Sequence, residues 1–239
     1  MKKTILLSLT ISAILFNTGI AQTTSDSLQK QTDHPIDTVI SPVDEFKATL
    51  LETYASFDTA KGMNEMVTAS NKLELIARKY NTEWAAQYYA GLCLTILSYI
   101  EKDEKKRDAY IDKAEGLSDK AKELYKSEYD EIYVLEAMIA NARLAVKPGS
   151  RYKKYGDIFN ANIEKAKNLR PENPRIYYLQ GTSVYYTPKF FGGGAKNAQP
   201  YFEKADALYQ NEKHDDIYKP YWGKKQNTDL LKKCKDENK

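Results

Sequence analysis

Apolar residues recur at three- and four-residue steps along almost all of this 239-residue sequence from Val43 onward. This spacing puts the apolar side chains on one face of an α-helix. Two such stripes are Phe46, Leu50, Leu51, Tyr54 and Phe57, and then Met66, Ala69, Leu73, Ile76 and Tyr80. We find no convincing alternating pattern of strands and no Asn-Gly hairpin signal. The sequence therefore predicts an all-α fold.

Short breaks separate the expected helices. They lie at Lys61-Gly62, Asn81-Thr82, Lys147 to Ser150, Pro171 to Pro174, and the triple glycine Gly192 to Gly194. Helices that are joined by connections this short pack as antiparallel neighbours. We therefore expect consecutive helices to form antiparallel pairs.

The clearest expected pair begins at Asn173-Pro174. Its two helices carry a recurrent set of aromatic, small and aliphatic residues: Tyr177, Leu179, Gly181 and Val184, and then Ala198, Phe202, Ala205 and Leu208. The preceding helix repeats the steps of the second set in Phe159, Ile163, Ala166 and Leu169, followed by Pro171. This pattern resembles the tetratricopeptide repeat (TPR).

The TPR resemblance covers about residues 44 to 210 and is strongest in the last pair. The small residues Gly91, Ala137 and Gly181 are 46 and 44 residues apart, whereas the repeat of the family is roughly 34 residues long. We therefore expect longer helices or inserted loops. The resemblance implies antiparallel helix pairs stacked as a TPR-like right-handed solenoid.

The N-terminus has the composition of a secretory signal peptide. Lys2 and Lys3 precede a mostly apolar run from Thr4 to Phe16, and Gly19 and Ala21 form a small-x-small cleavage pattern. The run is shorter than the roughly 20 apolar residues of a membrane-spanning helix, so a membrane anchor is the weaker alternative. We predict a signal peptide over residues 1–21, cleavage after Ala21, and a periplasmic or secreted mature protein.

The rest of the chain divides into three predicted parts. Residues 22–42 are polar and form a flexible leader, residues 43–233 form the TPR-like helical repeat domain, and residues 234–239 form a basic tail. Residues 1–21 contain two lysines and no acids, so their removal lowers the net charge from +3 to about +1. A nearly neutral chain argues against a nucleic-acid partner. We also expect no stable membrane insertion after the signal is removed.

The chain contains little material for catalysis or metal binding. It has two histidines, His34 and His214, and no Ser-His-Asp or Cys-His spacing stands out. Cys93, Cys234 and these histidines lack the spacing of a structural zinc site. We therefore predict no catalytic residues, no metal site and no cofactor. Cys93 is expected to be a small buried hydrophobe, and a disulfide with Cys234 is an open alternative.

The triple glycine invites comparison with a phosphate-binding loop. Such a loop needs a preceding strand and the spacing G-x-x-x-x-G-K-[ST]. Here Ala195 separates Gly194 from Lys196, and Asn197 stands in the Ser/Thr position. We therefore interpret Tyr185 to Gly194 as an enlarged turn between two helices.

The resemblance also implies a binding surface. In TPR proteins the first helix of each pair lines a concave groove, and the positions that match this face are Tyr88, Asn141, Tyr178, Thr182 and Tyr185. The enlarged turn is expected to be structural, and the alternative is that Phe190 or Phe191 from this turn caps a binding groove. Tyrosine suits such surfaces because it combines a rigid apolar ring with a polar tip. The alternative for any one tyrosine is that it packs between helices.

Two functions are compatible with these features. The first is an exported, non-catalytic TPR-like scaffold that binds a protein or peptide in the bacterial envelope through its aromatic groove. The second is a periplasmic helical protein that binds a small ligand and is associated with a transporter. The chain resembles components of tripartite transporters in its export, its repeat type and its enlarged loop.

Overall fold

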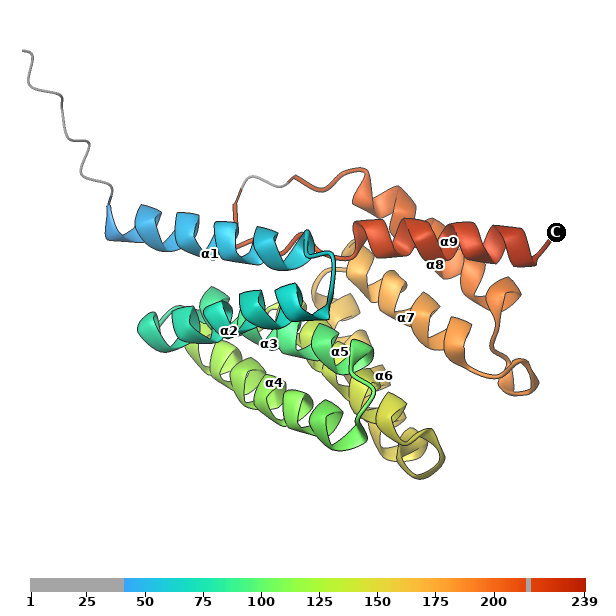
Figure 1. Ribbon diagram of the computed structural model, residues 1–239. Coiled ribbons are helices and arrows are strands. Elements are labelled where there is room, and N and C mark those ends of the chain that lie inside the picture. Colours follow the sequence, from blue (N-terminus) through green and yellow to red (C-terminus); the bar gives the residue numbers. More distant parts are fainter. Residues whose placement is uncertain (1–40, 214–215) are drawn as a thin grey trace, which may run out of the picture. The chain divides into compact units, whose positions relative to one another are not determined.

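Helices make up most of the chain that the computed structural model describes, residues 41–213 and 216–239 (Figure 1). The α-helices in chain order are α1 Pro42–Asp58, α2 Met63–Lys79, α3 Trp84–Ile100, α4 Glu104–Tyr125, α5 Asp130–Val146, α6 Pro148–Leu169, α7 Pro174–Tyr186, α8 Ala195–Tyr209 and α9 Lys224–Glu237. A short 3-10 helix, η1 Lys189–Phe191, precedes α8. These ranges contain no strand, so the predicted all-α class is confirmed.

The N-terminal predictions lie outside the described residues. These are the signal peptide, its cleavage after Ala21 and nearly all of the leader over residues 22–42. His34 and His214 lie outside them too. Within the described ranges, none of the helices is long and apolar enough to cross a membrane.

Local sequence signals fix several helix ends. Ser41 caps α1 by accepting a hydrogen bond from the Asp44 amide, and Asn173 caps α7 by accepting one from the Arg175 amide. A proline follows each cap, at a position where its missing N–H costs nothing. Helix α7 ends just before Thr187, because the residue ahead of Pro188 disfavours helical backbone.

Consecutive helices pack in pairs, as the short breaks predicted. The pairs are α1 with α2, α3 with α4, α5 with α6, and α7 with α8. The first helices also contact one another, α1 with α3, α3 with α5, and α5 with α7 (Figure 1). Helices α4 and α6 have 22 residues each, which accounts in part for spacings longer than those of TPR proteins. The right-handed solenoid remains a prediction.

Small residues allow the helices of a pair to approach closely. A Cβ atom on Gly181 would lie 2.7 Å from the ring of Phe202 on the partner helix α8. Gly91 on α3 likewise faces the backbone of α4, where its Cβ would lie 3.4 Å from the Ala114 carbonyl oxygen. Close packing across the pair therefore requires a glycine at Gly181, whereas at Gly91 a Cβ would only reach ordinary van der Waals contact.

The C-terminal boundary differs from the prediction. Residues 234–237 do not form a separate basic tail, because they continue α9, which packs against α8. The side chain of Cys234 is fully buried in a cluster with Ala198, Phe202 and Leu231. Because lysines flank Cys234 in the sequence, the apolar face of this helix was not recognised there.

Candidate functional site

A segment that we call the strap, residues 216–223, lies across the first helices of the pairs. Its Asp216 lies 3.9 Å from the Lys47 ammonium on α1. The ring of Tyr218 packs 6.1 Å from Phe46 and 5.9 Å from Trp84, measured between ring centroids. The strap therefore touches helices that are far away from it in the sequence.

Trp222 anchors the end of the strap. Its indole Nε1 donates a hydrogen bond of 2.8 Å to the Tyr88 hydroxyl on α3. Its ring meets that of Tyr178 on α7 edge-on, with the centroids 6.2 Å apart. Both Trp222 and Ile217 are buried. The strap is thus held by a polar contact and by packing at the same point.

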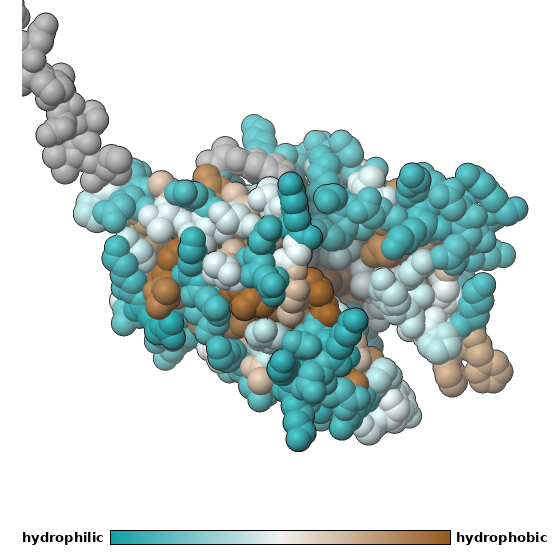
Figure 2. All heavy atoms as spheres, in the orientation of Figure 1, coloured by the Kyte–Doolittle hydropathy of each residue, from teal (hydrophilic) through white to brown (hydrophobic). Residues whose placement is uncertain are grey.

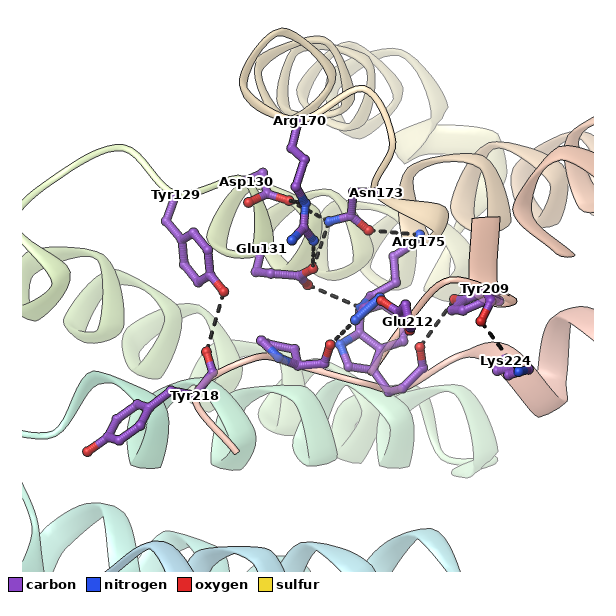
Figure 3. A network of polar contacts seen from close by, with 12 residues as sticks. Tyr129, Asp130, Glu131, Arg170, Asn173, Arg175, Tyr209, Glu212, Tyr218 and Lys224 are labelled. Carbon is purple, nitrogen blue, oxygen red and sulfur yellow. Dashed lines mark hydrogen bonds and ion pairs between the residues drawn. The ribbon is translucent and has the colours of Figure 1, made fainter. Parts of the chain in front are cut away.

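A buried charge network lies beside the strap (Figure 3). Arg175 is fully buried, and its guanidinium pairs with Glu131 at 3.2 Å and with Glu212 at 2.5 Å. The same guanidinium donates a hydrogen bond to the Pro220 carbonyl of the strap. Arg175 therefore joins α5, α7, the end of α8 and the strap.

The acidic side of this network comes from the first turn of α5. The Asn173 amide donates to Asp130 at 2.6 Å and to Glu131 at 2.7 Å, and Arg170 pairs with both carboxylates. Burial raises the pKa of the Glu131 carboxyl, and the neighbouring Arg175 opposes that rise. These two acids are thus paired with structural cations, and sequence reasoning missed Arg175 because its partners are distant in the chain.

Tyr88 does not lie in an open groove. Its side chain is fully buried, and its hydroxyl donates to Glu131 at 3.2 Å while accepting from Trp222. Burial raises the pKa of this phenol well above its ordinary value. The expectation of a free surface at Tyr88 is therefore wrong, because the strap covers it.

The other half of the first-helix face carries a second tyrosine cluster. Tyr99 lies on α3 about three turns beyond Tyr88 and so points to the same side. It is 37% exposed, and its hydroxyl donates to the Met138 carbonyl of α5 at 3.1 Å. Burial raises the pKa of the Tyr99 phenol, nearby Tyr178 raises it further, and Asn141 lowers it. The predicted residues Asn141 and Tyr178 therefore each lie close enough to Tyr99 to influence its pKa.

Thr182 lies on the next turn of α7 after Tyr178. The Thr182 hydroxyl donates to the Tyr178 carbonyl at 2.8 Å, and both side chains are partly exposed. Burial raises the pKa of Tyr178 to about 12. Figure 2 shows a hollow between α7 and the α5–α6 pair. We call this cluster, Tyr99, Asn141, Tyr178 and Thr182, the open tyrosine face.

Tyr185 and Phe190 have different surroundings. The Tyr185 hydroxyl donates to Glu237 of α9 at 2.5 Å, and this contact raises the pKa of Tyr185 to about 12. Its ring packs toward Phe202 of α8. Phe190 is 91% exposed, so it caps no groove in this structure, and that alternative is wrong. Sequence reasoning placed Phe190 in the correct turn but could not give the direction of its ring.

Two cavities border the strap. One, of about 320 Å³, lies beside the charge network and is lined in part by Tyr129, Arg170 and Leu208. The other, of about 380 Å³, lies between α1 and the strap, next to Lys47 and Ile217. Neither cavity contains a residue of the open tyrosine face.

The next question is whether the described residues could form a metal site or a disulfide. No group of His, Cys, Asp and Glu side chains in the part of the chain that is described could hold a metal ion. Cys93 and Cys234 are free, buried thiols that belong to different hydrophobic clusters. The alternative of a disulfide between them is therefore wrong.

Comparison with known proteins gives one informative result. No protein-family model and no curated protein matches the sequence. Among solved structures, the HusA haemophore from Porphyromonas gingivalis matches with a TM-score of 0.69 and 32% sequence identity. The match covers 81% of this chain and 94% of HusA. The chain therefore belongs to the same family as this haemophore.

Proposed function

We propose that this protein is an exported, non-catalytic carrier that binds haem on the open tyrosine face. The observation that carries the proposal is the 32% identity to a haemophore over 94% of that protein. Membership of the TPR family and residence in the periplasm are parts of the proposal that rest on the sequence alone.

The residues of the open tyrosine face suit a flat aromatic ligand. Tyr99, Tyr178 and Thr182 present at least partly exposed side chains that combine apolar surface with polar groups. Small-ligand sites are mostly apolar and contain a few polar groups that fix the orientation of the ligand. Aromatic rings also favour offset or edge-to-face contacts with other rings. A porphyrin would find both kinds of contact here.

The donor atoms of the described residues favour tyrosine as a ligand for the haem iron. These residues include no histidine, both cysteines and Met138 are buried, and the partly exposed Met63 and Met66 lie on α2, which carries no residue of the open tyrosine face. Tyrosine is an established axial ligand of haem iron. The raised pKa of Tyr178 keeps its phenol protonated at neutral pH. Ferric iron would have to displace that proton, so ligation through oxygen should strengthen as the pH rises.

The strap favours a small ligand over an extended peptide. It already fills the part of the first-helix face around Tyr88 where a peptide would lie. This supports the second of our two sequence-based hypotheses, a small-ligand carrier. Association with a transporter, or with another protein of the envelope, remains a prediction.

Absorbance titration of the mature protein with haemin tests the proposal. We expect a shifted Soret band at 1:1 stoichiometry and a rise in affinity with pH. The variant Tyr99→Phe/Tyr178→Phe should lose the absorbance spectrum of an iron–tyrosine bond. Its affinity for haemin should fall about tenfold, which corresponds to the loss of ~1.4 kcal/mol of binding free energy. Metal-free protoporphyrin should bind the wild type and this variant equally, because it needs no iron ligand.

Tyr152→Phe is the matched control, since Tyr152 is an exposed tyrosine on α6 outside the cluster. It should bind haemin like the wild type. An absence of any haemin binding would refute the proposed ligand. Haemin binding that is equally tight in the wild type and in Tyr99→Phe/Tyr178→Phe at every pH would refute the proposed site.

A further inference from the structure

The turn between α7 and α8 is a fixed structure with its own hydrogen bonds. The amides of Gly192, Gly193 and Gly194 donate to the carbonyls of Lys189, Pro188 and Val184 at 3.0, 3.2 and 3.0 Å. Gly192 and Gly194 have φ angles of +84° and +93°, which favour glycine. A Cβ on Gly193 would lie 1.9 Å from the Thr187 carbonyl oxygen. The glycines are therefore needed for the shape of this turn.

This turn holds two apolar rings out in solvent. Phe190 is 91% exposed and Phe191 is 74% exposed, and their rings meet edge to face at 5.2 Å. Tyr186, at the end of α7, is 70% exposed. Exposed phenylalanines that a rigid turn presents together are unlike the scattered apolar residues of ordinary surfaces. We call Tyr186, Phe190 and Phe191 the aromatic tip.

The charges around the aromatic tip are mostly positive. Residues 186–199 contain Lys189 and Lys196 and no acidic residue. The end of α9 lies at the same end of the helix pair, because Asn238 donates to Gln199 at 2.7 Å. That end of α9 adds three exposed lysines: Lys232, Lys233 and Lys235.

The three acids at this end already have partners, and the first, Glu203, accepts a hydrogen bond from Gln199 at 2.8 Å. Asp236 pairs with Lys239 at 2.9 Å, and Glu237 accepts the Tyr185 hydroxyl. The lysines around the tip therefore outnumber the acids, and none of the five has an ion-pair partner among the described residues. Positive charge next to exposed aromatic rings matches the chemistry of an anionic lipid surface.

We infer that the aromatic tip is a reversible attachment point for anionic membranes. Phe190 and Phe191 enter the boundary between headgroups and acyl chains, while the lysines contact lipid phosphates. Lysine stems can lie along apolar surface with the charge in water, which suits this position. The attachment is peripheral and does not depend on the haem proposal, because the open tyrosine face contains none of these residues.

A lipid surface fits better than a protein partner for a reason of size. Specific protein interfaces bury about 800 Å² on each side and need a broad complementary surface. The aromatic tip offers three rings on one turn and a fringe of flexible lysines. Attachment to a membrane surface needs no such complementary partner, because its strength grows with the apolar area inserted and with the attraction of positive charge to anionic lipids.

Vesicle flotation of the mature protein tests this inference. We expect binding to phosphatidylcholine vesicles that contain phosphatidylglycerol, weaker binding to phosphatidylcholine alone, and release at high salt. Phe190→Ser/Phe191→Ser should lower the affinity at least about tenfold. Lys189→Gln and Lys196→Gln should each lower it about fivefold on the anionic vesicles only.

Two further variants sharpen the result. Leu75→Ser removes an equally apolar, exposed side chain from α2 and should bind vesicles like the wild type. Phe190→Trp should show blue-shifted tryptophan emission on adding vesicles, beyond any change in the wild type. The Phe190→Ser/Phe191→Ser variant should still bind haemin normally, so this test and the haem test fail independently.

Two results would overturn the inference. One is vesicle binding that is equal in the wild type and in Phe190→Ser/Phe191→Ser. The other is a complete absence of vesicle binding by the wild type. If the same rings then mediate self-association or capture a protein, the aromatic tip belongs to a protein interface.

Discussion

At the scale of single residues, Arg175 joins segments that are far apart in the chain. A fully buried guanidinium is costly unless carboxylates and carbonyls surround it. Here Glu131, Glu212 and the Pro220 carbonyl supply these partners from three separate segments. The cost of burying the charge therefore favours the one arrangement in which all three segments meet.

Asp108 gives a pH-dependent prediction at the same scale. It accepts hydrogen bonds from Arg143 at 3.0 Å and from Arg151 at 2.6 Å, and Arg151 is the main cause that lowers its pKa to about 2. A lowered pKa contributes stability above the unfolded value of about 3.9, and this stability is lost as the pH falls toward 2.

We expect Asp108→Asn to lower the free energy of unfolding by about 1–2 kcal/mol at pH 7, after allowance for solvent screening. The gap between wild type and variant should shrink as the pH falls from about 4 to about 2. Urea unfolding followed by circular dichroism measures both. Asp157→Asn, at an exposed i,i+4 pair with Lys153, should cost about 0.5 kcal/mol or less. A gap that is constant with pH would contradict this role.

At the scale of helices, the α7–α8 pair shows how small residues set the distance of approach. Gly181 has a low helix propensity, so Gly181→Ala would stabilise an isolated helix by about 1 kcal/mol. In the pair, however, the new Cβ would lie 2.7 Å from the Phe202 ring. The clash and the propensity therefore act in opposite directions.

We expect the clash to win, so that Gly181→Ala lowers the free energy of unfolding by about 1–3 kcal/mol. Gly116→Ala on α4 is the matched control, because a Cβ there would meet nothing within 4 Å. It should be neutral or stabilise by up to about 1 kcal/mol. Chemical denaturation measures both, and equal effects at the two glycines would argue against close packing of this pair.

Local sequence signals predicted most of the helices. The period of the apolar residues and the short breaks act within a few residues, and so do the caps at Ser41 and Asn173 that the structure shows. The sequence also predicts a closing helix from about Tyr221 to Lys233, whereas α9 begins three residues later, at Lys224. The reason is that Tyr221 and Trp222 use their rings to pack against α1, α3 and α7, so their apolar character does not come from a helix of their own.

The candidate site was predictable only in part. The TPR resemblance implied one shared face for Asn141, Tyr178 and Thr182, and in the structure Tyr178 and Asn141 each influence the pKa of Tyr99. Tyr88 was implied on the same face but is buried by the strap. Periodicity gives the face of a helix on which a residue lies, and it cannot say what covers that face.

At the scale of the whole described unit, the strap connects the first and last helix pairs. It contacts α1 through Phe46, α3 through Tyr88 and α7 through Arg175. Within the strap, Trp222 is a large side chain that is buried and also makes a polar contact, the hydrogen bond to Tyr88. We therefore expect Trp222 to control how cooperatively the helix pairs unfold.

Trp222→Ala should lower the free energy of unfolding by about 3–5 kcal/mol, because it removes a buried indole. Trp222→Phe should cost less, since it keeps most of the packing and loses the hydrogen bond to Tyr88, worth about 1 kcal/mol. Denaturation followed by both far-ultraviolet circular dichroism and tyrosine fluorescence measures these effects. Equal stability of the alanine variant and the wild type would show that the strap contributes nothing to the fold.

By itself, the sequence determined the helices and their pairing, because apolar period, caps and short connections are local and each acts within a few turns. Only the tertiary structure decided that a strap crosses the first helices, that Tyr88 is buried and that the aromatic tip points into solvent. The contact between Tyr88 and Trp222 joins residues 134 positions apart. Such a contact depends on the packing of all the intervening helices, which no local pattern records.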